Sequence, residues 1–208
     1  MNIAKLFKMQ KEFDVRVLED KELSWAGTFQ SRILAFIDEV AECMKEWRGF
    51  KFWSENTKPR TYVRENCPDC AKKGYRRGNP PVDEKLGTHG LGNHWYYCEK
   101  CAGYLVVDKN PLLEEYVDGL HFAISLCIHT GVKVNLPVAI YCDNVTEQFL
   151  EIYSLAVRLK EDPTPLNADV LLSHYLGLGE MLSFKLEEIE RAYIEKNQVN
   201  HLRQDNGY

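Results

Sequence analysis

The sequence has no apolar run long enough to cross a membrane. Lys and Glu interrupt its hydrophobic segments from the N-terminus onward, and no uninterrupted stretch approaches the roughly 18 residues that a spanning helix needs. It also has no dense block of Lys or Arg, and its formal net charge is −5. These absences argue against a membrane protein and against binding to a long nucleic-acid duplex. We therefore expect a soluble, cytosolic protein.

The sequence also has little strand-like alternation. That pattern is confined to about Cys67 to Asp108, whereas apolar residues elsewhere recur with helical period. We predict an all-α fold, a helical bundle formed by residues 1–62 and 107–208, with a small β-rich insert at residues 63–106. Expected helices include one around Ile33–Trp47, one from Pro111 to a stop at Gly131, one opened by Asn144, and two at about 167–176 and 180–203, separated at Gly177 and Gly179.

Four of the seven cysteines occur as two C-x-x-C pairs within the insert. Two such pairs can surround a tetrahedral Zn²⁺, and four sulfur ligands leave no open position for water, so we predict a structural zinc-ribbon-like site. Its ligands are Cys67, Cys70, Cys98 and Cys101. His89 or His94 replacing one cysteine is a less favoured alternative, and the absence of a βαβ pattern disfavours a redox role. Cys43, Cys127 and Cys142 are expected to be small core residues.

A basic cluster in the insert could serve a partner. Lys72, Lys73, Arg76 and Arg77 are its most positive group, and they indicate either a contact with another protein or nucleic acid, or a solvated turn.

The first predicted helix carries acids at Glu39, Glu42 and Glu46, which share one face away from its apolar stripe. Alone, this pattern is typical of a solvated face. The helix after Asn110 adds Glu115 and Asp118, three residues apart, in a segment that is apolar nearly all round and therefore expected to be buried. Buried carboxylates need cations or a metal. If the two faces meet, four carboxylates form a site for Mg²⁺ or Mn²⁺, which usually serves phosphates.

The last predicted helix aligns two cations and an amide. Lys196, Asn200 and Arg203 follow at steps of four and three, so they share one stripe. Cations in a final turn can simply complement the helix dipole. Together with a metal-carboxylate site, the stripe indicates a phosphate clamp.

These motifs resemble the all-α nucleoside triphosphate pyrophosphohydrolases, and specifically the dimeric all-α dUTPases of bacteria, phages and kinetoplastids. The matching segments are E-x-x-E at Glu39 and Glu42 followed by FKFW at Phe50–Trp53, E-x-x-D at Glu115 and Asp118 followed by LHF, and the terminal KNQVNHLRQDNGY. The zinc-ribbon-like insert departs from the family pattern and leaves regulation and partners open.

The resemblance implies Mg²⁺-dependent hydrolysis of dUTP to dUMP and pyrophosphate, with dUDP as a further substrate, in a cytoplasmic homodimer of a bacterium or a phage-infected host. Such an enzyme keeps uracil out of DNA and supplies dUMP for dTMP synthesis. Two or three Mg²⁺ ions would be held by Glu39, Glu42, Glu115 and Asp118, with Glu39, or else Glu42, as the general base.

The resemblance also assigns substrate contacts. Lys196, Arg203 and Lys51 would reach phosphate, with Asn200 on the sugar or a phosphate. Gln10 would read the uracil edge, while Trp53 and Phe122 would stack on the ring or line the pocket. Surface and core roles stay open for Lys51 and for both aromatic residues, and His121 is expected to be a satisfied packing residue.

Two other functions remain open at this stage. One is a related pyrophosphohydrolase acting on dCTP or another non-standard nucleotide. The other is a regulatory binding module that engages a partner through the zinc insert, although the presence of all four metal-site carboxylates argues against a degenerate enzyme.

Overall fold

The structure, a computed structural model, describes residues 1–72, 82–83, 88–89, 98–102, 104–134 and 138–207. The chain divides into two units, one formed by Met1–Pro59 with Leu112–Tyr208 and the other by Arg60–Pro111. The first is helical and contains α1 (Ile3–Asp20), α2 (Trp25–Trp47), α4 (Pro111–Thr130), α5 (Val145–Glu161), α6 (Pro165–Met181) and α7 (Leu186–Asp205). The all-α fold class is confirmed. Among the described residues, no helix combines the length and hydrophobicity of a membrane span.

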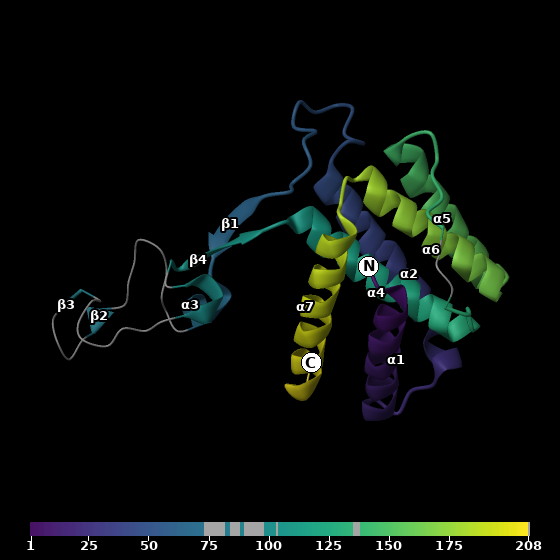
Figure 1. Cartoon of the computed structure of the whole chain (residues 1–208), viewed down its shortest axis with the longest axis horizontal. Helices are drawn as coiled ribbons and strands as arrows, with labels where there is room; N and C mark the ends of the chain where they lie inside the picture. The colour runs from purple at the N-terminus through teal and green to yellow at the C-terminus, as the bar shows by residue number, and fades with distance from the viewer. Residues whose placement is uncertain (73–81, 84–87, 90–97, 103, 135–137, 208) are drawn as a thin grey trace. The chain divides into compact units, whose positions relative to one another are not determined.

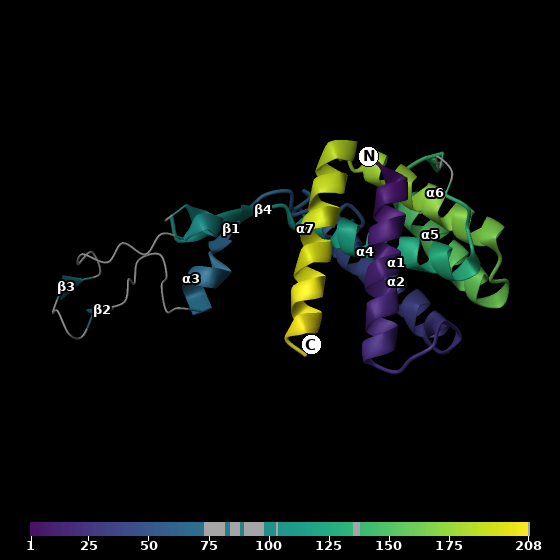
Figure 2. The same ribbon diagram turned by 60° about the horizontal axis from the view of Figure 1, so that its bottom comes forward.

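Helix α4 is the central element of the helical unit. It begins at Pro111 and ends before Gly131, as the sequence predicts, and more than half of its side chains are buried. Figures 1 and 2 show the α5–α6 pair on the opposite side of the unit from α7. Helix α5 follows the predicted cap, with the Asn144 side chain accepting a hydrogen bond from the Glu147 backbone N–H.

Helices α1 and α7 pack side by side and run in the same direction, although they lie at opposite ends of the sequence. The Asn2 backbone N–H donates to Glu190 at the start of α7, while Arg16 near the end of α1 pairs with Asp205 at the end of α7. This pairing places the final helix of the chain against the first.

The predicted break at Gly177 and Gly179 is wrong, because α6 continues through both glycines to Met181. Each glycine instead permits close packing. A Cβ on Gly177 would lie 2.0 Å from the Ile140 carbonyl oxygen, and one on Gly179 would lie 2.4 Å from the Tyr116 hydroxyl. The missing side chains therefore allow close packing against neighbouring segments, and they do not end the helix.

A stacked tyrosine pair joins α4 to α6. The rings of Tyr116 and Tyr175 lie 4.9 Å apart at an interplanar angle of 4°. Each hydroxyl donates to the other residue's backbone carbonyl, at 3.2 Å from Tyr116 and 2.8 Å from Tyr175. Gly119 makes room for the pair, since a Cβ there would meet the Tyr175 hydroxyl at 2.1 Å. The reciprocal bonds fix α4, which carries half of the predicted acidic site, against α6.

The second unit is built on a two-stranded antiparallel sheet. Strand β1 (Val63–Asn66) pairs with β4 (Val106–Lys109), and Val63 lies opposite Lys109. The unit also contains the single-turn α3 (Pro68–Lys72), a 3-10 turn at Glu99–Cys101, and the two-residue strands β2 (Val82–Asp83) and β3 (Thr88–His89). The predicted small β-rich insert is confirmed as a part of the fold class.

Candidate functional site

Three of the four predicted metal-binding carboxylates meet between α2 and α4. Glu39 and Glu42 lie one turn apart on α2, and Glu115 faces them from the first half of α4. Each offers a carboxylate oxygen, and these oxygens all lie within 4.8 Å of one another. We call these three residues the acidic trio. Its side chains are half-buried, so three hard oxygen ligands converge where a divalent cation can reach them.

The electrostatics of the acidic trio favour a bound cation. Burial raises the pKa of Glu39 to about 7, with further increases from the charges of Asp118 and Glu42, while Lys196 opposes the shift. Burial likewise raises the pKa of Glu115 to about 7, again with Asp118 and Glu42 as the next causes. Like charges that are partly removed from water are relieved by protons or by a metal. The arrangement therefore fits Mg²⁺, whose usual ligands are carboxylate oxygens.

The fourth predicted ligand, Asp118, makes an ion pair with Lys196 of α7. Both side chains are largely buried and the Lys196 ammonium donates directly to the Asp118 carboxylate. Burial raises the pKa of Asp118, and the charge of Lys196 acts against that increase. The pair brings a residue predicted to bind metal and a residue predicted to bind phosphate into contact with each other. It also places a cation beside the acidic trio.

The remaining members of the closing stripe lie further along α7. Asn200 is half-buried and Arg203 is exposed. The charge of Arg203 lowers the pKa of Asp118, so this guanidinium also acts on the acidic region. Lys196 is thus the inward member of the stripe and Arg203 the outward one.

The predicted residues after α2 are more exposed. Trp53 is 65% exposed and its ring meets the edges of Phe50 and Phe52 at centroid distances of 5.8 and 5.0 Å. The Lys51 ammonium lies 5.8 Å from the centre of the Phe50 ring. Phe122, on α4, is partly buried against the hydrophobic core. The FKFW segment therefore presents aromatic surface to solvent, whereas Phe122 contributes to packing.

Gln10 on α1 is 4% exposed and belongs to a buried polar network. Its Nε2 donates to Asp14 Oδ1 at 2.8 Å. Its Oε1 accepts from the Tyr193 hydroxyl at 2.8 Å and lies 2.7 Å from His121 Nδ1. A second ion pair extends the network, because Arg32 Nη1 lies 2.8 Å from Asp14 Oδ2. The sequence analysis missed this network, although the i,i+4 spacing of Gln10 and Asp14 is compatible with their contact on one helix face.

His121 departs from the expected satisfied packing residue. Its ring stacks on Tyr193 with centroids 3.7 Å apart, and burial lowers its pKa to about 3. Its Nε2 is buried and has no hydrogen-bond partner in the described part of the chain. Asn197 Nδ2, one helical turn after Tyr193, is in the same condition. Buried polar atoms without partners are costly, so both atoms need a partner such as a bound water or a ligand.

The four cysteines of the insert form the second candidate site. All are buried and none forms a disulfide. The Cys67 and Cys98 sulfurs lie 3.7 Å apart, and those of Cys70 and Cys101 lie 3.6 Å apart. Thiolates about 2.3 Å from a tetrahedral Zn²⁺ are separated by about 3.8 Å. The cluster therefore fits zinc.

The backbone around the cluster favours a thiolate at Cys98, because the N–H of Cys101 lowers the pKa of the Cys98 thiol to about 7. Burial and hydrogen bonds with the other three thiols raise the pKa of Cys70 instead.

Of the two histidines that could replace a cysteine ligand, His94 and the side chain of His89 lie outside the described residues. Three members of the basic cluster, Lys73, Arg76 and Arg77, also lie outside them. The isolated cysteines follow the prediction for Cys43 and Cys127, which are buried, whereas Cys142 is only half-buried.

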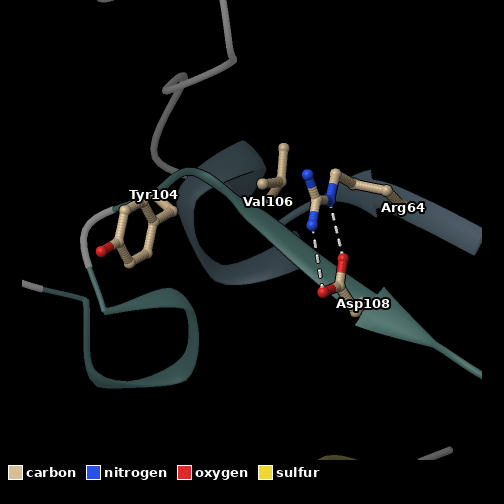
Figure 3. A pocket seen from close by; sticks show the side chains of 4 residues that line it. All are labelled: Arg64, Tyr104, Val106 and Asp108. Atoms are coloured by element: carbon tan, nitrogen blue, oxygen red, sulfur yellow. Dashed lines mark hydrogen bonds and ion pairs between the residues drawn. The ribbon is translucent and has the colours of Figure 1, made fainter.

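A hollow on the β1–β4 sheet is lined by Arg64, Tyr104, Val106 and Asp108 (Figure 3). The Arg64 guanidinium makes two hydrogen bonds to Asp108, of 2.7 and 3.2 Å, and holds the pKa of that carboxyl below its usual value. Tyr62 donates to the same carboxylate at 3.0 Å. The charges lining the hollow are therefore paired with each other.

Comparison with known proteins gives one family. The model of a family described as dUTPase matches residues 2–71 and 104–208, which leaves out most of the insert. No curated protein and no solved structure matches the chain.

Proposed function

The chain belongs to the all-α dUTPase family and so has dUTP diphosphatase activity, for which we propose a Mg²⁺-dependent hydrolysis of dUTP to dUMP and pyrophosphate. We propose dUDP as a second substrate. The observation that carries the metal assignment is the convergence of Glu39, Glu42 and Glu115 within 4.8 Å. In the cell this reaction would keep uracil out of DNA and supply dUMP for dTMP synthesis.

The acidic trio, joined by Asp118, is the proposed ligand set for two or three Mg²⁺ ions, with Mn²⁺ as a substitute. Bound there, the ions would supply charge neutralisation at the phosphates and a more acidic water. The raised pKa values of Glu39 and Glu115 support this assignment, because a divalent cation stabilises the ionised carboxylates that burial and the neighbouring charges disfavour.

Glu39 is the proposed general base. A carboxylate beside a metal-bound water would take the proton of that water as it attacks the phosphate. Its position on the rigid α2, next to Glu42, supports a fixed orientation toward the attacking water. Glu42 is the alternative base on the same face of α2.

Lys196 is proposed to exchange partners when nucleotide binds. In the structure it neutralises Asp118, and a phosphate oxygen would compete for the same ammonium. Asp118 would then join the acidic trio as the fourth ligand. Arg203 and Asn200, further along α7, would complete the contacts to phosphate and sugar, with Lys51 as an additional cation.

The base contacts are proposed for Gln10, Trp53 and Phe122. Gln10 would use its second amide N–H, because its oxygen and its other N–H are engaged within the protein. The exposed ring of Trp53 supports stacking, because it has free surface for a base or for a second chain. We also propose a homodimer. Exposed apolar side chains on α2 and α5, namely Leu34, Leu150 and Val157, support an interface between two helical units.

For the insert we propose a structural Zn²⁺ held by the four cysteines, whose sulfur separations support tetrahedral coordination. The unit is too small for a core of its own, so zinc would supply much of its folding free energy. We also propose that the insert contacts a protein partner, because all of the predicted catalytic residues lie in the helical unit.

The test is a nucleotide panel with separated products. Purified protein is incubated with Mg²⁺ and dUTP, dUDP, dCTP, dTTP or UTP, and the products are resolved by chromatography. The proposal predicts dUMP and pyrophosphate from dUTP, dUMP and phosphate from dUDP, and little turnover of the other three. Preferred turnover of dCTP would retain the metal site and reject the assignment of the base.

A further inference from the structure

Asp14 is a buried carboxylate outside the acidic trio, and every contact it makes is with a donor. Its Oδ2 accepts from Arg32 Nη1 at 2.8 Å and from the Ser125 hydroxyl at 2.6 Å. Its Oδ1 accepts from Gln10 Nε2 at 2.8 Å. A carboxylate can only accept hydrogen bonds, so the Gln10 amide must turn its NH₂ group toward Asp14.

That orientation fixes the other end of the amide. Gln10 Oε1 faces the Tyr193 hydroxyl, which donates to it, and His121 Nδ1 at 2.7 Å. An amide oxygen can only accept, so His121 Nδ1 must carry the ring proton. A neutral imidazole has one ring proton, and burial keeps His121 neutral by lowering its pKa to about 3. Nε2 is therefore left with a lone pair.

We propose that Asp14 is a positioning residue that acts through Gln10 to hold His121 as the Nδ1–H tautomer, so that His121 Nε2 accepts a hydrogen from the bound nucleotide. This inference rests on the proposed function. In dUTP the uracil N3–H can only donate, whereas the 3′-hydroxyl can donate or accept, so the tautomer selects most strongly for the uracil N3–H. A nucleotide group that only accepts is disfavoured at this position.

The unpartnered atoms support a ligand here. His121 is 5% exposed, and its Nε2 has no partner among the described residues although it is buried. Asn197 is 4% exposed and its buried Nδ2 also lacks a partner in the described chain. The two lie on α4 and α7, both of which contribute to the Asp118–Lys196 pair. An acceptor and a donor without partners match a ligand that carries both kinds of group.

The tautomer can be observed directly in the wild-type protein. Long-range ¹H–¹⁵N correlation spectra of protein labelled at its six histidines distinguish a protonated ring nitrogen from an unprotonated one. A His121→Gln variant assigns the signals. We expect a protonated Nδ1 and an unprotonated Nε2 for His121 at pH 7. A protonated Nε2 would overturn the inference, and this measurement needs neither catalysis nor a variant of Asp14.

The Asp14→Asn variant tests the relay. Arg32 and Ser125 would hold the new side chain by its oxygen, so its NH₂ group would face Gln10 and turn that amide around. His121 Nδ1 would then meet an NH₂ group and lose its proton to Nε2. We expect the two ¹⁵N signals of His121 to exchange character. Unchanged signals in a folded Asp14→Asn protein would contradict the relay.

Ser125→Ala is the matched control. It removes a hydrogen bond from the same carboxylate but leaves the charge of Asp14 and the orientation of Gln10 in place. Its His121 spectrum should therefore equal that of the wild type. A tautomer change in Ser125→Ala as well would show that any disturbance of the cluster suffices, and would overturn the specific role of Asp14.

Kinetics then connect the tautomer to the substrate. With Asp14→Asn, Nε2 becomes a donor facing the uracil N3–H, which can only donate, so KM for dUTP should rise by about tenfold or more while kcat changes by less than about threefold. The rise should be retained with 2′,3′-dideoxy-UTP, which keeps the uracil N3–H, whereas a rise that disappears with this substrate would overturn the contact to uracil N3–H. An unchanged KM for dUTP would reject the nucleotide contact. No turnover by the wild type would reject the proposed function, and the tautomer would still be tested by its spectrum.

Discussion

Without Mg²⁺, the unfolding free energy of the helical unit should fall as pH rises. The Glu115→Gln variant should show much less of this fall. The pKa values of Glu39 and Glu115 rise from 4.5 to about 7 in the folded chain. The folded state therefore binds more protons than the unfolded state between these values, so stability falls as pH increases from about 4.5 to about 7 and then levels off.

The size of the loss follows from the shift and from solvent screening. A shift from 4.5 to about 7 corresponds to about 3 kcal/mol for one carboxyl. Both side chains are half-exposed and water screens their repulsion, so we expect about 1 kcal/mol from each. With a denaturant slope of about 2 kcal/mol per molar urea, the midpoint should fall by about 1 M between pH 5 and pH 8.

Urea unfolding followed by helical circular dichroism measures this effect. Mg²⁺ is removed by dialysis without a chelator, so that a metal at the cysteine cluster stays in place. Glu115→Gln should be more stable than the wild type at pH 8 without Mg²⁺. Saturating Mg²⁺ should reverse that order, because it stabilises only the chain that retains its ligands. Glu161→Gln, an exposed residue at the end of α5, is the control and should follow the wild type.

A wild-type midpoint that stays level or rises between pH 5 and pH 8 without Mg²⁺ would contradict the raised pKa values of Glu39 and Glu115. The same pH profile in Glu115→Gln and Glu161→Gln would contradict them as well.

Three further outcomes are expected. Lys196→Ala leaves the Asp118 carboxylate buried without its cation, so urea unfolding should show a free energy of unfolding lower by about 3 kcal/mol at pH 8. The decrease should be smaller at pH 5, where the raised pKa of Asp118 favours its neutral form, and equal decreases would argue against the pair. Gly119→Ala places a Cβ 2.1 Å from the Tyr175 hydroxyl and should lower the unfolding free energy by about 2 kcal/mol or more, whereas an unchanged value would contradict the tight α4–α6 contact. Metal analysis should find one zinc per chain, and a zinc chelator should expose residues 60–111 to proteolysis while the helical circular dichroism persists; a zinc-free protein with four rapidly reactive thiols would reject the site.

The sequence predicted those features that depend on local pattern. Pro111 marked the start of α4, and Asn144 marked the start of α5. Apolar residues on nearly all sides of α4 predicted that this helix is buried. The C-x-x-C spacing likewise predicted that four cysteines would gather. Each of these signals is carried by residues close together in the chain, where helix capping and side-chain period act directly.

Features that depend on contacts between distant segments were not predicted. Gly177 and Gly179 have the local signature of a helix end, and only the positions of Ile140 and Tyr116 show that they permit close packing instead. The sequence analysis assigned Asp118 to Mg²⁺ and Lys196 to phosphate. Helical periodicity within each segment does not show that these two residues form an ion pair. The Asp14–Arg32 ion pair joins α1 to α2 and was missed for the same reason.

We propose the acidic trio as the metal site of dUTP hydrolysis. The most direct measurement is the rate of pyrophosphate release from dUTP over a Mg²⁺ titration, for the wild type, Glu115→Gln and Glu161→Gln. We expect saturable Mg²⁺ activation of the wild type and of Glu161→Gln, and a kcat lower by about 100-fold or more in a folded Glu115→Gln protein. Turnover of dUTP that is independent of Mg²⁺, or that survives in Glu115→Gln, would contradict this assignment.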